Sequence, residues 1–174
     1  MTDPAPAAPD LAEAERPALA DAQAWTAAEG GYSHEQGTKP HSLAVGLGDS
    51  PAGLLAWIVE KLRAWSDCDG DVEAVFPRDD LLTRVSASWF TSTIGTSFTP
   101  YVERRETVDE PVPVPTAFTW FSGEMLHAPR SLADRFFDVR MREERGRGGH
   151  FAAWEQPESF VAGLRTALAL ASPA

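Results

Sequence analysis

Cysteine is almost absent from this chain, because Cys68 is the only one among its 174 residues. A lone cysteine excludes a disulfide framework and any multi-cysteine zinc or iron–sulfur site within one chain. Long apolar runs are absent too, and none approaches the roughly 20 residues that a membrane-spanning helix needs. The N-terminus has no basic segment followed by an apolar one, so it does not resemble a secretory signal. We therefore expect a protein of the cytoplasm that has no membrane partner.

Basic residues are scarce as well. The chain has 15 Lys and Arg against 26 Asp and Glu, which gives a formal net charge of −11. Nucleic-acid binding requires a basic face, so we expect no nucleic-acid partner. Hydrophobic residues make up 43% of the chain, as in ordinary globular proteins, and its length suits a single domain.

The first half of the chain is predicted to be largely helical after a disordered tail. Residues 1–10 hold three prolines and three alanines and are interpreted as that tail. The Ala-rich residues 11–29 suit a helix that has Pro17 in its first turn. Residues 32–40 are polar and are predicted to be a loop. The apolar run 42–47 suits either a short buried strand or a turn of helix.

The clearest helix is predicted over residues 51–65. Ser50 can cap it, Pro51 suits its first position, and apolar residues recur at helical spacing from Leu54 to Trp65. A second helix is predicted from about Pro77 to Phe90. Residues 95–102 are predicted to be a turn, and residues 103–113 an exposed connector.

The second half alternates strand and helix. A β-branched and aromatic run predicts a strand over 114–121, and residues 131–137 suit a helix. A second strand is predicted over 139–145, followed by a flexible glycine turn at 146–149 and an amphipathic helix over 157–170. This order favours an α/β fold in which helices connect the strands of a sheet.

Three acidic residues, Asp67, Asp69 and Asp71, alternate as in a calcium-binding loop. The glycine and the twelfth position do not match such a loop, so a solvated acidic turn is the better interpretation. His34 and His41 have no nearby cysteine and are interpreted as surface residues. We therefore expect no metal ion at these residues.

Ser50 lies in a Gly-Asp-Ser-Pro-Ala-Gly context that invites comparison with the nucleophile elbow of serine hydrolases. The elbow pattern would need glycine where Ala52 stands, and helix capping already explains Asp49 and Ser50. A serine esterase therefore remains a remote alternative.

Glu124 and His150 form the strongest candidate pair. Each follows a predicted strand, and sites in α/β sheets assemble in the loops at the carboxyl ends of strands. An acid followed by a histidine is also the chain order of the α/β-hydrolase triad. The carboxylate would orient the imidazole, which would act as a base. The pattern alone also allows two unrelated loop residues.

Several motifs resemble microsomal-type epoxide hydrolases of the α/β-hydrolase superfamily. The C-terminal ones are Val114-Pro115-Thr116, Glu124-Met125-Leu126-His127-Ala128-Pro129 and Arg147-Gly148-Gly149-His150-Phe151. Upstream ones are Gly31-Tyr32-Ser33-His34-Glu35-Gln36-Gly37, Leu47-Gly48-Asp49-Ser50-Pro51 and Gly95-Thr96-Ser97. The resemblance covers about residues 11–170 and only the C-terminal half of the family. It implies a partial α/β-hydrolase fold, made of a helical lid and the last strands and helices of the sheet.

The resemblance also implies roles. Glu124 matches the triad acid and His150 the general base, while Tyr32 and Tyr101 match two lid tyrosines that hydrogen-bond the epoxide oxygen. A phenol with a pKa of about 10 can protonate a forming alkoxide and still be protonated at pH 7. The tyrosines are then expected to face the cavity that holds His150. The implied activity is hydrolysis of hydrophobic epoxides to vicinal diols, and the resemblance implies neither a metal ion nor an organic cofactor for it.

The same resemblance divides the chain at residue 113. Residues 11–113 correspond to the lid or cap region with one core segment, and residues 114–174 to the C-terminal core segment. The strands that the resemblance leaves out imply a small sheet, of about three strands, with an uncovered edge.

The family's nucleophilic aspartate has no counterpart here. No G-x-D-x-G elbow occurs in the sequence, and Asp49 belongs to a motif that follows the elbow. The alternative is therefore a non-catalytic fragment, or one half of a split hydrolase. Such a half would pair with a separately encoded N-terminal half or with a second copy of itself.

Overall fold

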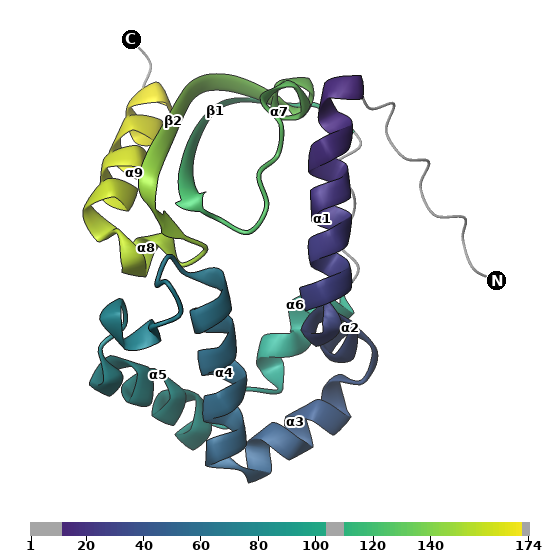
Figure 1. Ribbon diagram of the computed structural model, residues 1–174, viewed down its shortest axis with the longest axis vertical. Helices are drawn as coiled ribbons and strands as arrows, with labels where there is room; N and C mark the ends of the chain where they lie inside the picture. The colour runs from purple at the N-terminus through teal and green to yellow at the C-terminus, as the bar shows by residue number, and fades with distance from the viewer. Residues whose placement is uncertain (1–11, 104–109, 172–174) are drawn as a thin grey trace, which may run out of the picture.

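The computed structural model describes residues 12–103 and 110–171, and helices dominate the first of these segments (Figure 1). The predicted tail lies outside the described residues, as does most of the predicted connector. Helical elements of the first segment are η1 Glu13–Glu15, α1 Arg16–Glu29, α2 Gly31–Thr38, α3 Pro40–Asp49, α4 Pro51–Trp65, η2 Val72–Ala74, α5 Arg78–Phe90, η3 Thr96–Phe98 and α6 Thr99–Val102. The second segment contains β1 Val112–Gly123, α7 Arg130–Phe136, β2 Phe137–Gly149, α8 Ala152–Glu155 and α9 Pro157–Ala171.

Helix α4 has the bounds that the sequence predicts. The hydroxyl oxygen of Ser50 accepts a hydrogen bond of 3.0 Å from the backbone N–H of Gly53, so Ser50 acts as the helix cap. Leu54, Leu62 and Trp65 are buried along one face. This face is the stripe that the apolar spacing indicated.

The predicted loop at residues 32–40 is wrong, because these residues form α2 and the start of α3. Tyr32 and Gln36 lie one helical turn apart and both point inward. Gln36 is buried, and the ring of Tyr32 packs 4.9 Å from that of Trp65, centroid to centroid. A polar helix is thus stabilised by two inward residues. The run 42–47 belongs to α3, so its helical alternative holds.

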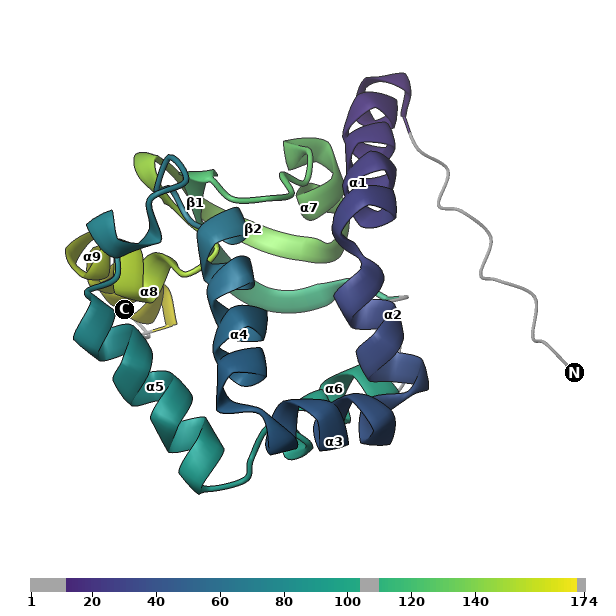
Figure 2. The ribbon, with the colours of Figure 1, turned by 60° about the horizontal axis from the view of Figure 1, so that its bottom comes forward.

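Strands β1 and β2 pair in parallel and are connected through α7, as the order of elements predicted. The described residues form a sheet of two strands rather than about three, since the apolar run 42–47 is helical. Helix α9 packs on β1 and β2, while α1 lies on the other side of the sheet with its start beside α7 (Figures 1 and 2). The turn predicted at 95–102 contains the short helices η3 and α6.

The glycines at 146–149 do not form a flexible turn as predicted, because they belong to β2. Gly148 has a φ of +103°, and a Cβ there would lie 2.8 Å from the ring of Phe121. A Cβ on Gly149 would lie 2.7 Å from the carbonyl oxygen of Trp65. Close packing of three backbone segments, rather than flexibility, therefore explains these two glycines.

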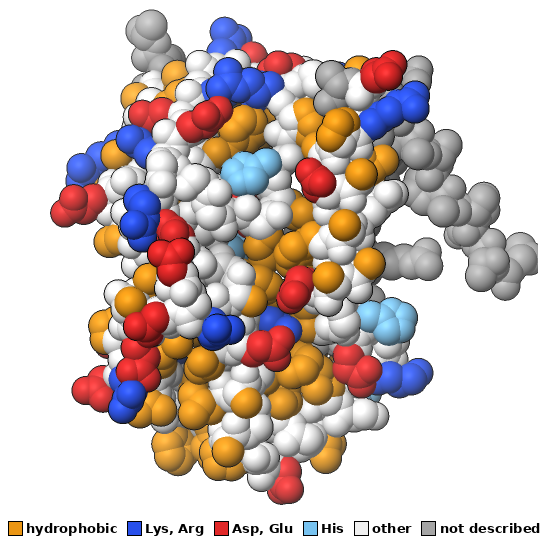
Figure 3. All heavy atoms as spheres, viewed as in Figure 1, with side chains coloured by type: hydrophobic (Ala, Val, Ile, Leu, Met, Phe, Trp, Pro, Cys, Tyr) orange, Lys and Arg blue, Asp and Glu red, His pale blue; other side chains and the backbone are white. Residues whose placement is uncertain are grey.

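Two apolar clusters hold the helices together. Leu47, Leu54, Val85 and Phe98 join α3, α4, α5 and η3. Leu62, Phe76 and Leu81 form the second cluster, against which Phe151 and Trp154 pack. The second cluster thereby connects the helices to the segment that follows β2. Hydrophobic side chains also gather on the surface at the end of the molecule where α3, α4 and α5 lie (Figure 3).

The carboxylate of Glu155 joins the end of α4 to the end of β2. One of its oxygens accepts hydrogen bonds from the backbone N–H groups of Asp67, at 2.8 Å, and Gly149, at 2.9 Å. The other oxygen accepts one from Phe151 at 2.9 Å. Three donors on a single carboxylate fix the path of the chain around residue 150.

Asp67 adds a second link at the same place, so the prediction of a purely solvated acidic turn is wrong for this residue. Its Oδ2 accepts hydrogen bonds from the backbone N–H of Gly148, at 2.9 Å, and from Nε of Arg147, at 2.7 Å. The hydrogen bond from Gly148, together with Arg147, lowers the pKa of Asp67 below its ordinary value. Folding therefore favours the ionised carboxylate.

Among the described residues, no single helix has the length and apolar composition to cross a membrane. Helices α3 and α4 pass this test only as a pair, and the pair is bent by 115°.

We predict that Asp67→Asn lowers the free energy of unfolding at pH 7 by about 1 kcal/mol, since a charged hydrogen-bond acceptor is replaced by a neutral one. The folded-state pKa of Asp67 is depressed, so its contribution is present above the ordinary value of 3.8 and is lost as pH falls through the lower folded-state value. Urea unfolding at pH 7 and in that acidic range measures both effects.

Asp69→Asn is the matched control, because Asp69 lies in the same acidic loop and is exposed. It should leave the stability within the error of the measurement. Equal stabilities of the two variants at both pH values would contradict the link through Asp67.

Candidate active site

Glu124 lies directly after β1, where the strand ends at Gly123. Its backbone N–H donates to the carbonyl oxygen of Phe121 at 3.1 Å, and its Oε1 accepts from the N–H of Met125 at 2.9 Å. These bonds turn the chain away from the sheet and hold the carboxylate at the end of the strand. The side chain is 29% exposed.

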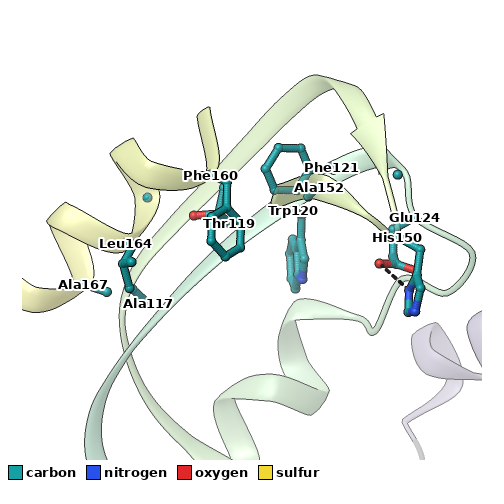
Figure 4. Close-up of a pocket in the computed structure, with 12 residues that line it drawn as sticks. Ala117, Thr119, Trp120, Phe121, Glu124, His150, Ala152, Phe160, Leu164 and Ala167 are labelled. Carbon is teal, nitrogen blue, oxygen red and sulfur yellow. Dashed lines mark hydrogen bonds and ion pairs between the residues drawn. The ribbon is translucent and has the colours of Figure 1, made fainter. Parts of the chain in front are cut away.

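His150 lies directly after β2, and its backbone N–H donates to the carbonyl oxygen of Trp65 at 2.9 Å. Its Nδ1 is 3.1 Å from Oε1 and 3.3 Å from Oε2 of Glu124. The expected hydrogen bond between the two side chains is thus confirmed, and Figure 4 shows them facing one another from the ends of the two strands.

The geometry of this pair defines what it can do chemically. With Nδ1 facing the carboxylate, that nitrogen carries the proton, and Nε2 is left to accept one. The imidazole is 43% exposed, so water can reach it. The rings of Trp65 and Phe151 meet it edge to face at 5.7 and 5.2 Å and hold its orientation. The arrangement suits a general base that acts on water.

A pocket of about 340 Å³ extends from this pair along β1 and α9. Thr119 and Phe160 line it, as do Leu164 and Ala167, and Figure 4 shows these residues farther along β1 and on α9, away from the strand ends that hold the pair. Most of its lining is apolar.

Tyr32 on α2 and Tyr101 on α6 lie together, with ring centroids 5.9 Å apart and planes at 81°. Burial raises the pKa of Tyr32, and both the electrostatic effect of Tyr101 and a hydrogen bond with it raise that pKa further. The neutral phenol is therefore the stable form at neutral pH. The two tyrosines are also the only ones in the chain.

The tyrosines do not share a pocket with His150, contrary to the expectation from the sequence. They line a neighbouring pocket of about 470 Å³, whose apolar walls include Trp57, Ile58, Leu62, Trp65 and Ile94. The indole of Trp65 lines this pocket and contacts both Tyr32 and His150. The structure thus links the tyrosine pair to the histidine–glutamate pair through one tryptophan.

The remaining candidates lie elsewhere. The Ser50 hydroxyl caps α4, and Asp49 is the last residue of α3. His34 and His41 are exposed on α2 and α3. Within residues 12–103 and 110–171, no group of three or more His, Cys, Asp or Glu side chains could hold a metal ion.

Two residues of this site had no assigned role in the sequence. The sequence indicates Trp65 only as the last residue of an apolar helix stripe. In the described structure its buried Nε1 has no hydrogen-bond partner. Glu155 lies five residues after His150, and only its three backbone partners reveal what it does. An acid at short spacing after the candidate histidine was the available signal.

Comparisons with known proteins agree with this architecture, although no family model matches the chain. Epoxide hydrolase 1 of Sus scrofa is 36% identical over 158 residues, which are 82% of this chain and 34% of that relative. Juvenile hormone epoxide hydrolase 2 of Ctenocephalides felis is 37% identical over 143 residues, which are 74% of this chain and 31% of that relative. The chain therefore spans about one third of the length of the curated relatives that it matches.

Solved structures give the same result. The crystal structure of juvenile hormone epoxide hydrolase from Bombyx mori superposes with a TM-score of 0.80 and 30% identity, covering 91% of this chain and 42% of that one. The Aspergillus niger epoxide hydrolase superposes with a TM-score of 0.76 and 26% identity, covering 97% and 43%. The described residues thus form part of an α/β-hydrolase fold. In sequence and in structure, the chain belongs to the epoxide hydrolase family and matches the C-terminal part of its members.

Proposed function

We propose that this chain supplies the acid–base pair and the phenol pair of an enzyme that hydrolyses epoxides to vicinal diols. The observation that carries the proposal is the hydrogen bond between His150 and Glu124. Trp65 contacts both His150 and Tyr32, and Tyr101 packs against Tyr32. A histidine–carboxylate pair serves many hydrolases. The two phenols favour a reaction in which an oxygen atom that breaks its bond to carbon must receive a proton.

In the first step, an aspartate from a segment outside these 174 residues attacks one carbon of the epoxide. The carbon–oxygen bond breaks, an ester forms, and the alkoxide takes a proton from Tyr32 or Tyr101. The raised pKa of Tyr32 supports this role, because the phenol keeps its proton until the alkoxide, a much stronger base, forms beside it.

In the second step, Nε2 of His150 takes a proton from water, and the hydroxide attacks the ester carbonyl. The bond between the ester carbonyl carbon and the alkoxide oxygen breaks, and the alkoxide takes the proton from the imidazolium of His150. The diol leaves, and the regenerated aspartic acid returns its proton to the solvent. Glu124 would hold the Nδ1–H and stabilise the imidazolium that forms. The exposure of the imidazole supports this step, since water must enter beside it.

Hydrophobic epoxides are the proposed substrates. The pocket beside the tyrosines is lined mainly by aromatic and aliphatic side chains, and its polar contributions come from hydroxyl groups, Gln36 and Lys61. An epoxide held against the edge of Trp65 would be within reach of both the phenols and the imidazole. We propose that the helices before residue 113 act as the lid over this position.

The proposed partner is the N-terminal segment that would bring the aspartate, in the same polypeptide or as a separate one. Helix α9 presents Phe160, Leu164 and Leu168 to solvent, with 41%, 50% and 62% of their surfaces exposed. A two-stranded sheet with an apolar helix face beside it suits coverage by further strands and helices. A second copy of the chain is the competing occupant.

We predict that the chain hydrolyses styrene oxide only together with a segment that carries the aspartate. His150→Ala should lower the multiple-turnover rate of this complex by about 10²–10⁴-fold, because general-base assistance is lost, while one equivalent of ester accumulates. Diol formation measures turnover, and mass spectrometry of the trapped segment measures the ester.

His34→Ala is the control for this prediction, because His34 is exposed on α2 and should leave turnover unchanged. Robust turnover by the chain alone that requires His150 would contradict the need for an added nucleophile, and Asp49 would be the first residue to test.

We predict that Tyr32→Phe and Tyr101→Phe each slow ester formation by about tenfold, because the alkoxide loses a proton donor. The His150→Ala background isolates this step. The raised pKa of Tyr32 implies that its proton is retained to a higher pH than that of an ordinary phenol, so ester formation should decline only in that alkaline range. Unchanged ester formation in the double variant would exclude the phenols as donors.

We predict that Leu164→Lys weakens binding of the N-terminal segment at least tenfold, because it places a charge on the exposed face of α9. Leu82→Lys is the matched control, since Leu82 is also an exposed leucine but lies on α5. Titration calorimetry measures both affinities. Equal weakening by the two variants, or none, would contradict the proposed docking face.

A further inference from the structure

Among the described residues, Lys61 is the one basic side chain that lines the tyrosine pocket. Its Nζ lies 5.3 Å from the centroid of the Tyr32 ring, 5.5 Å from that of Trp57 and 5.8 Å from that of Trp65. Trp57 and Trp65 are each one helical turn from Lys61 on α4, so all three side chains share one face. The lysine side chain is only 16% exposed.

The described residues place few charged or titratable groups around this ammonium. In that part of the chain, Tyr32, Tyr101 and Lys61 are the titratable side chains of the pocket lining. Glu60 is the ion-pair partner of Lys61, at 2.7 Å, and its side chain is 61% exposed. Water screens Glu60 far more than it screens a largely buried ammonium, so the field of Lys61 on the neighbouring rings is only partly cancelled.

An ammonium against an aromatic ring interacts with the neutral phenol and with the phenolate to different extents. The neutral ring attracts the cation through its quadrupole alone. When Tyr32 gives up its proton, a negative charge shared between oxygen and ring adds a Coulombic attraction to the cation. The cation therefore stabilises the phenolate more than the phenol.

We propose that Lys61 is a positioning residue that acts through Tyr32, by stabilising the phenolate that forms when this phenol donates its proton to the opening epoxide. The inference rests on the proposed function. The proton passes from Tyr32 to the alkoxide oxygen as the carbon–oxygen bond breaks, and solvent returns a proton to the phenolate afterwards. Lys61 keeps its own protons and does not touch the substrate.

This role resolves a conflict within the site. Burial and Tyr101 both raise the pKa of Tyr32, which keeps the phenol neutral but also makes it a weaker acid. A fixed positive charge beside the ring opposes that effect at the moment when negative charge develops. Lys61 thus partly offsets the loss of acidity that burial causes in Tyr32.

The test uses the fact that the chain has only two tyrosines, so the absorbance of tyrosinate reports on this pocket alone. In Lys61→Met the titration midpoint should move to higher pH, because the methionine keeps an unbranched apolar stem and removes the charge. Lys61→Arg should restore the wild-type midpoint. Glu60→Gln should move the midpoint to lower pH, since it removes the charge that partly cancels the ammonium.

Lys39→Met is the matched control, because Lys39 is the only other lysine and is exposed between α2 and α3. It should leave the midpoint unchanged. A midpoint that does not move in Lys61→Met, or that moves equally in Lys39→Met, overturns the inference. A loss of stability in Lys61→Met without a moved midpoint also overturns it, since that result assigns Lys61 to packing alone.

The activity arm uses the complex with the aspartate-bearing segment. Lys61→Met should slow ester formation about tenfold and leave ester hydrolysis by His150 unchanged, with rescue by Lys61→Arg. The titration needs no turnover, so it tests the effect of Lys61 on Tyr32 independently of the proposed function. A moved midpoint with unchanged ester formation contradicts the proposed function of Tyr32 and leaves the electrostatic effect of Lys61 on the phenol in place.

Discussion

The carboxylate of Glu155 accepts hydrogen bonds from three backbone N–H groups, and the arrangement of the site depends on this contact. Its partners belong to the segment after α4 and to the segment after β2, which are far apart in the sequence. Because both segments are bound to one charged acceptor, the backbone of His150 meets the carbonyl oxygen of Trp65. The helical half and the sheet are thereby joined at the place where the candidate chemistry lies.

Trp65 contacts two groups that lie in different environments. The imidazole of His150 is partly exposed and paired with Glu124, which suits the handling of water. Tyr32 packs against the rings of Trp65 and Tyr101, and burial raises its pKa, which suits a donor that must keep its proton until an alkoxide forms. One tryptophan thus touches both an accessible base and a partly buried phenol.

The sheet and α9 leave apolar surface exposed. Parallel strands normally have both faces covered by helices. In the described residues two parallel strands carry α9, and this helix exposes Phe160, Leu164 and Leu168 to solvent. The relatives are about three times as long as the matched segment, so there is enough additional chain in them to cover such a face.

Local patterns in the sequence determined the helices that bury a continuous apolar stripe, such as α4, and the strand–helix–strand order that brings Glu124 and His150 to neighbouring strand ends. Spacing and capping are properties of adjacent residues, so they can be recognised without the fold. The sequence also identified the family through its motifs.

Sequence patterns could not predict three features of the structure. These are helix α2, the closely packed glycines of β2, and the hydrogen-bond partners of Asp67 and Glu155. Each depends on a residue distant in the chain. The ring of Tyr32 packs against Trp65, Gly149 lies against the carbonyl oxygen of Trp65, and Glu155 accepts a hydrogen bond from the N–H of Asp67. The contact of Trp65 with both Tyr32 and His150 was likewise decided by tertiary packing, because only packing determines which rings meet between a helix and a sheet.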